Sequence, residues 1–200
     1  LGPVPVAEVE VRAELERPGR SVELLTAELS AGGRVAMRAR AWRLAGSPVD
    51  AGPPEDPVPP LPAAESPIPA HFASTGYLPS VEWRSVSGDW EHPGPATVWA
   101  RPRIPLIEGE TMTGLQRLLC VADSSSGISA ALPWVGWLFI NTDLTVHLTR
   151  QPRGDWILLD AVTRIAAGGA GLASAALGDG DGVLGRSAQT LLVRQVQPPA

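Results

Sequence analysis

The chain has 200 residues, 44% of them hydrophobic, which is enough for one large domain or two small ones with a sizeable core. Its net charge of −5 argues against a nucleic-acid partner, because nucleic-acid binding needs a basic face. The single cysteine, Cys120, excludes an internal disulfide and suits a reducing cytoplasm. We expect no membrane span and no signal peptide, because no apolar run approaches about 20 residues and no charged-then-apolar leader opens the chain.

Three antiparallel strands are predicted at the start of the chain. Apolar and charged side chains alternate strictly in the first of them, as is typical of a strand with one face in water. A turn at residues 17–20 follows it, and Gly32 and Gly33 make the hairpin turn before the third strand. The predicted strands cover residues 8–16, 21–30 and 35–44. Because the pattern begins almost at the first residue, we expect the chain to be cut at its front.

Residues 45–70 are dense in proline, with nine prolines in this stretch. Proline lacks a backbone donor and disfavours both helix and sheet. We therefore predict an extended connector that runs over the surface between two units.

Beyond the connector we predict two strands, one helix and then four more strands. The helix is expected to begin at Thr113, which has capping-box spacing with Gln116, and to run to about Ser129. Apolar residues at helical spacing give it one buried face. The predicted strands cover residues 81–86, 96–104, 138–150, 156–165, 171–177 and 185–193.

The two halves of the chain share an order of features. Each has a strand, a turn rich in Arg, Pro and Gly, another strand, a Gly-Gly turn and a further strand. We therefore expect an internal repeat. Only the C-terminal copy has a helix before its strands, so a matching first helix and strand are expected to be missing from the front.

Three segments carry a resemblance to the type II acyl-CoA thioesterases: residues 117–124, 140–148 and 187–190. The resemblance implies an α+β double hotdog, in which antiparallel sheets wrap central helices. Residues 1–44 would be the remainder of the first hotdog, residues 45–70 the connector and residues 71–200 the second hotdog. It also implies an acyl-CoA substrate, hydrolysis without a cofactor, and a homo-oligomer.

The resemblance also implies the site residues. The family's catalytic aspartate, on the second central helix, matches Asp123, and its glutamine, in the last strand, matches Gln189. Its hydroxyl residue stands two positions before an aspartate in the first strand after the helix. Asn141, before Asp143, occupies that place, which departs from the threonine of the better-known members.

Thioester hydrolysis needs a positioned water, a base and donors for the developing oxyanion. Asp123 is the only carboxylate on the predicted helix beyond its first turn, at the margin of the apolar face, where desolvation would make it a stronger base. Gln189 and Asn141 could orient the water or the aspartate. Backbone N–H groups near a helix start could polarise the thioester carbonyl.

Simpler interpretations of these residues stay open. Asp123 could be a solvated residue or a cap, Gln189 a surface residue and Asn141 a strand terminator. Asp143 could instead be the ionised partner, but it is expected to pair with an arginine or to cap a turn. Cys120 is not expected to be a nucleophile, because its neighbours are apolar and no His follows at an established spacing. No metal site is expected, because the three histidines, His71, His92 and His147, share no metal-ligand spacing.

Two further function classes are compatible with a hotdog fold. The first is a non-catalytic protein that binds an acyl group or assembles with partners. Convergence of Asp123, Asn141 and Gln189 on one tunnel would favour the hydrolase over it. The second, a hotdog dehydratase, needs a catalytic His on or near the central helix, where the sequence shows none.

Overall fold

The computed structural model describes residues 3–50, 56–70 and 76–196 of the chain. These residues divide into two compact units, residues 1–53 and residues 54–200.

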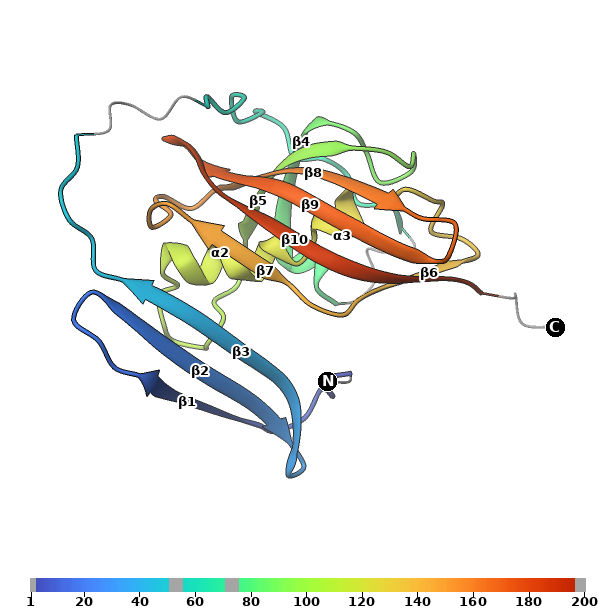
Figure 1. Ribbon diagram of the computed structural model, residues 1–200. Coiled ribbons are helices and arrows are strands. Elements are labelled where there is room, and N and C mark those ends of the chain that lie inside the picture. Colours follow the sequence, from blue (N-terminus) through green and yellow to red (C-terminus); the bar gives the residue numbers. More distant parts are fainter. Residues whose placement is uncertain (1–2, 51–55, 71–75, 197–200) are drawn as a thin grey trace. The chain divides into compact units, whose positions relative to one another are not determined.

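The N-terminal unit is an antiparallel sheet of three strands in the order β1-β2-β3 (Figure 1). The register places Val11 opposite Leu29 and Leu29 opposite Met37, so apolar side chains share one face. Gly32 and Gly33 have positive φ angles of 54° and 76°, which a two-residue hairpin turn requires. The strands are β1 (Val9–Arg17), β2 (Val22–Ala31) and β3 (Arg34–Leu44), which confirms the predicted meander.

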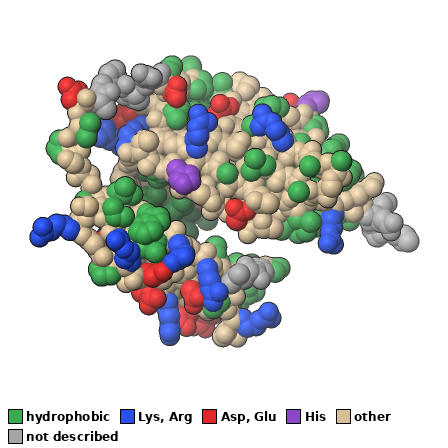
Figure 2. Space-filling view, in the orientation of Figure 1, with side chains coloured by type: hydrophobic (Ala, Val, Ile, Leu, Met, Phe, Trp, Pro, Cys, Tyr) green, Lys and Arg blue, Asp and Glu red, His purple; other side chains and the backbone are tan. Residues whose placement is uncertain are grey.

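The other face of this sheet is charged. On this face, cross-strand ion pairs join Arg38 to Glu28 and Arg40 to Glu16. A third pair, Arg43 with Glu23, lies at the end of the apolar face. Figure 2 shows blue and red side chains intermingled on this unit, at the bottom of the view. Exposed pairs of this kind contribute little to stability each, but they keep one face of the sheet in water.

The C-terminal unit is an antiparallel sheet of seven strands that carries two short helices on one face (Figure 1). The strand order is β4-β5-β8-β9-β10-β6, and β7 also pairs with β10. A 3-10 turn, η1 (Leu78–Ser80), precedes β4. The strands are β4 (Val81–Ser87), β5 (Ala96–Pro102), β6 (Trp137–Asn141), β7 (Thr145–Leu148), β8 (Ile157–Ile165), β9 (Ala170–Asp179) and β10 (Gly182–Gln195).

The core of this unit lies between the helices and the sheet. Helix α2 (Gly114–Ala122) packs on β5 and β8, and α3 (Ser125–Ile128) packs on β8 and β9. Leu118 of α2 is completely buried in one cluster with Leu159 and Leu177 of the sheet. Each such leucine contributes roughly 1.5–3 kcal/mol on burial. An antiparallel sheet with its helices on one face is the arrangement predicted for the hotdog.

The predicted helix over residues 113–129 is wrong in one respect, because the structure divides it into α2 and α3. The capping box at its start is confirmed: the Gln116 N–H donates to Thr113 Oγ1 at 3.2 Å, and the Thr113 N–H donates to Gln116 Oε1 at 2.7 Å. The break follows Ala122, whose carbonyl accepts a hydrogen bond from Ser125 Oγ at 2.7 Å. Serine side chains compete in this way with the helix backbone for hydrogen bonds.

One predicted strand is interrupted, and the described part of the proline-dense stretch has no regular secondary structure. The predicted strand over residues 138–150 is interrupted at residues 142–144, which separate β6 from β7. In the proline-dense stretch, residues 45–50 and 56–69 form neither helix nor strand, and none of them is buried. Its residues 51–55 lie outside the described part of the chain.

Among the described helices, none is long and apolar enough to cross a membrane.

Candidate active site

Asp123 lies at the junction between α2 and α3. It is the C-terminal cap of α2, with helical φ and ψ angles of −64° and −19°. The side chain is exposed, so the desolvation expected for it is not found. The reason is the helix break, which places Asp123 at the end of α2 instead of along its buried face.

Gln189 approaches Asp123 from β10 and is completely buried. Its Oε1 accepts a hydrogen bond from the Ser126 N–H at 3.1 Å. Because a backbone N–H can only donate, this contact assigns the acceptor end of the amide to Ser126. The Nε2 group then donates to Asp123 Oδ1 and to the Asp123 carbonyl, each at 2.9 Å.

Asn141 is the last residue of β6, and its Nδ2 group donates to Asp123 Oδ1 at 2.5 Å. The same carboxylate oxygen therefore accepts two amide donors, one from Asn141 and one from Gln189. The second oxygen, Oδ2, accepts no hydrogen bond from the residues that the structure describes. The structure thus brings together all three residues predicted from the sequence, which come from three separate elements.

The hydrogen bond from Ser126 to Gln189 uses a backbone N–H group at the start of α3. The Ser126 N–H, in the first turn of α3, is occupied by Gln189 Oε1. This backbone group is therefore not free to donate to a thioester carbonyl. It orients the glutamine, which in turn orients the aspartate.

Tyr77 also supports the helix junction, and the sequence patterns did not indicate it. Its hydroxyl donates to the Cys120 carbonyl at 2.8 Å and accepts from Ser124 Oγ at 3.0 Å. Desolvation raises the pKa of Tyr77, and electrostatic repulsion from Cys120 and Asp123 raises it further, so the hydroxyl keeps its proton as a donor. Tyr77 is the only tyrosine of the chain, which is the one signal that could have drawn attention to it.

Cys120 lies one turn before Asp123 on α2 and is partly buried. Burial raises the pKa of its thiol, which disfavours the reactive thiolate. This environment agrees with the expectation that Cys120 is not a nucleophile.

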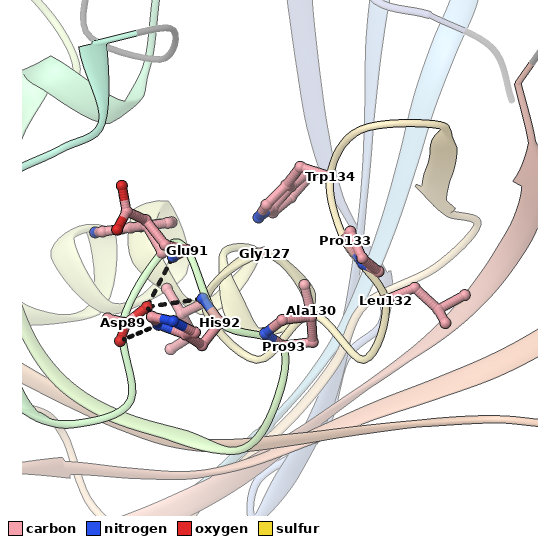
Figure 3. Close-up of a pocket in the computed structure, with 11 residues that line it drawn as sticks. Asp89, Glu91, His92, Pro93, Gly127, Ala130, Leu132, Pro133 and Trp134 are labelled. Carbon is pink, nitrogen blue, oxygen red and sulfur yellow. Dashed lines mark hydrogen bonds and ion pairs between the residues drawn. The ribbon is translucent and has the colours of Figure 1, made fainter.

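Two of the three histidines, His92 and His147, lie among the described residues. His92 contacts Asp89, with its Nδ1 2.9 Å from a carboxylate oxygen, in the turn between β4 and β5 (Figure 3). The Asp89 carboxylate raises the pKa of His92. His147 lies on β7, opposite Arg186 of β10, and His71 is outside the described residues.

The pocket beside His92 touches the short helix α3, through Gly127 and Ile128, so a histidine does lie near the central helices. The sequence did not show this approach, because β4 and β5 are distant from α3 in the chain. The pocket, of about 10 Å³, has room for roughly one water molecule. A second pocket, of about 370 Å³, lies between residues 58–61 and the tryptophans Trp99 and Trp156. Neither pocket includes Asp123, Asn141 or Gln189.

Family models match both parts of the chain. The model described as the acyl-CoA thioesterase C-terminal domain matches residues 53–193, and the model described as the N-terminal domain matches residues 1–44. No curated protein matches the chain.

Solved structures show the same fold at low sequence identity. The acyl-CoA thioesterase II TesB2 of Mycobacterium marinum is 20% identical, with a TM-score of 0.61 over 95% of this chain and 76% of that one. The tesB protein of Mycobacterium avium subsp. paratuberculosis is 16% identical, with a TM-score of 0.65 over 97% and 75%. A hot dog fold protein of unknown function from Alicyclobacillus acidocaldarius is 18% identical, with a TM-score of 0.68 over 98% and 76%. The fold is that of a double hotdog, and the chain belongs to the acyl-CoA thioesterase family.

Proposed function

We propose that this chain hydrolyses acyl-CoA thioesters to a free acid and CoA, with Asp123 as the general base for the attacking water. The observation that carries the proposal is the convergence of the Asn141 and Gln189 amides on Asp123 Oδ1, at 2.5 and 2.9 Å. Hydrogen bonds from amides to a carboxylate are stronger than those between neutral groups. They restrict the rotation of the carboxylate and leave its other oxygen for the water.

The reaction follows from this arrangement. Asp123 Oδ2 accepts a proton from water as the water oxygen attacks the thioester carbonyl carbon. The tetrahedral intermediate collapses with cleavage of the carbon–sulfur bond, and the departing CoA thiolate takes the proton back from Asp123. A fixed base and a positioned water remove much of the entropic cost of the step.

Asn141 fits this role although the better-known members have threonine at its position. A threonine hydroxyl and an asparagine amide can each donate one hydrogen bond to a carboxylate. The short contact between Asn141 and Asp123 supports a shared function. In this arrangement the two amides hold the aspartate rather than the water.

We also propose that residues 1–44 are the remainder of a first hotdog, residues 45–70 a connector and residues 71–200 the second hotdog. The N-terminal sheet has one apolar face, which includes the exposed side chains of Val11 and Met37. No helix covers that face within residues 3–50. A central helix on this face would complete the same arrangement that the C-terminal unit has.

The mutation Asp123→Asn tests the mechanism, because it preserves shape and removes the proton acceptor. We expect kcat to fall by roughly 10²–10⁴-fold, the usual range for loss of a general base, while the Kd for acyl-CoA changes little. Thiol release across acyl chain lengths measures the rate, and calorimetry measures binding. Asp160→Asn is the matched control, because Asp160 is an exposed residue on β8 whose carboxylate accepts a hydrogen bond from Thr97.

Two outcomes would contradict the proposal in different ways. An Asp123→Asn variant that retains the wild-type rate would eliminate Asp123 as the base. A wild-type protein that binds acyl-CoA but releases no thiol at any chain length would instead be a non-catalytic acyl-binding hotdog.

A further inference from the structure

The strands that hold the site have an interruption beside Gln189. Strand β10 pairs with β7 from Gly185 to Ala188 and with β6 from Leu191 onward. Gln189 and Thr190 fall between these two ladders, opposite the interruption at residues 142–144. An interrupted ladder leaves backbone donors and acceptors without their usual partners, and each must be satisfied in another way.

The Asp143 side chain closes this interruption. Its Oδ1 accepts the Thr190 N–H at 3.0 Å, in place of the strand carbonyl that a regular ladder would supply. The Thr142 N–H donates to the Thr190 carbonyl at 2.9 Å, so both backbone groups of Thr190 are satisfied. The Thr142 hydroxyl also donates to Asp143 Oδ1 at 3.3 Å. The hydrogen bonds from Thr190 hold the pKa of Asp143 below its usual value, so the carboxylate is the acceptor.

Both residues of this contact are close in sequence to an amide donor of the site. Thr190 directly follows Gln189, and Asn141 stands two residues before Asp143. In an antiparallel strand, successive residues direct their backbone groups to opposite neighbours. Thr190 therefore faces Asp143, whereas Gln189 pairs with Ala173 of β9. A single carboxylate thus ties the end of β6 to the part of β10 that carries Gln189.

We propose that Asp143 is a positioning residue: by accepting the Thr190 N–H it sets the distance at which Asn141 and Gln189 both reach Asp123. The inference rests on the proposed function, since it assigns a second carboxylate to the same reaction. Asp143 does not take the proton. It acts through the two amides, and its contribution depends on their presence.

The first test compares two substitutions at Asp143. Asp143→Ala removes the acceptor, and we expect kcat to fall about 10- to 100-fold with KM little changed, since a hydrogen bond to a charged group is lost. Asp143→Asn keeps an acceptor oxygen and is expected to restore most of kcat. Asp160→Ala removes a carboxylate that bridges two other strands of the same sheet, and it should leave kcat unchanged.

The second test is a double-mutant cycle with Gln189→Ala. If Asp143 acts through Gln189, Asp143→Ala costs much less in the Gln189→Ala background than in the wild type. Equal costs in both backgrounds, or a loss of melting temperature with no change in kcat, would mean a structural role only and would overturn the inference.

A third readout does not depend on activity. In the Asp143→Ala variant we expect faster hydrogen exchange at the Thr190 amide and shifted NMR signals for the Gln189 side-chain amide. If both stay as in the wild type, the positioning role is wrong whatever the kinetics show. If the wild type releases no thiol, the proposed function fails, and the NMR measurement still decides whether Asp143 positions Gln189.

Discussion

Gln189 and Asn141 donate to the same oxygen of Asp123, but they are held differently. Gln189 is completely buried, and both ends of its amide have partners, Ser126 at one end and Asp123 at the other. Asn141 is only partly buried and has a single side-chain contact to Asp123 among the described residues. Gln189 is therefore the more rigid of the two, and its replacement has consequences at both ends.

Gln189→Ala removes the donor to Asp123 and leaves the Ser126 N–H without a partner. We expect a loss of about 1–3 kcal/mol in transition-state stabilisation, or roughly 10- to 100-fold in kcat. This is smaller than the loss for Asp123→Asn, because the proton acceptor remains. Steady-state thiol release measures it, and Gln195→Ala is the control, because Gln195 is an exposed glutamine on the same strand. A wild-type rate for Gln189→Ala would exclude Gln189 from the site.

The last residue of β9, at the turn before β10, is a buried acidic side chain. Asp179 is completely buried, and each of its carboxylate oxygens accepts from Arg150 at 2.6 Å. The N–H groups of Arg153 and Asp181 donate to it at 2.8 and 2.9 Å. Burial acts to raise the pKa of Asp179, but these hydrogen bonds outweigh burial and lower it. The ionised form is therefore the one that the fold stabilises.

A pH dependence of stability follows from this pair. Because the pKa of Asp179 is lower in the folded chain than in the unfolded chain, its stabilisation is present above about pH 4 and is lost as the pH falls through the folded pKa. Asp179→Asn should lower stability at pH 7 by about 3 kcal/mol, since Arg150 loses its partner. That corresponds to roughly 6–12 °C in Tm for a chain of this size. Calorimetry from pH 3 to 7 should show a flatter dependence for the variant, and parallel curves for both proteins would contradict the assignment.

At the scale of the whole molecule, one edge of the larger sheet has features of an interface. Strand β6 ends the strand order, and its Leu138 and Ile140 are exposed. Leu192 of β10, opposite Ile140, adds to the same apolar surface. Exposed apolar edges of this kind commonly pair with another chain.

We therefore expect a homo-oligomer at micromolar concentration, as measured by light scattering. A charged substitution on the edge, Ile140→Glu, should shift the distribution toward the monomer, while Val135→Glu in the exposed loop before β6 should not. A monomer for the unmodified chain would count against this prediction.

The local features of the fold were readable from the sequence because they depend on neighbouring residues. Alternation of apolar and charged side chains predicted β1, and a Gly-Gly pair predicted the turn between β2 and β3. Thr113 with Gln116 predicted the start of α2. The three site residues were recognised from their resemblance to family positions. Their types match the chemistry, but nothing in their spacing along the chain brings them together.

Tertiary structure alone decided how those residues meet. Asp123 and Asn141 are 18 residues apart and Asp123 and Gln189 are 66 apart, so only the pairing of β6 with β10 and the packing of the helices on the sheet can join them. The helix break after Ala122 and the interruption between β6 and β7 were missed for the same reason. Both depend on hydrogen bonds made after folding, by Ser125 to the helix backbone and by Asp143 to Thr190. Local propensity specifies the elements, whereas the geometry of the site is set by contacts between residues that are distant in the sequence.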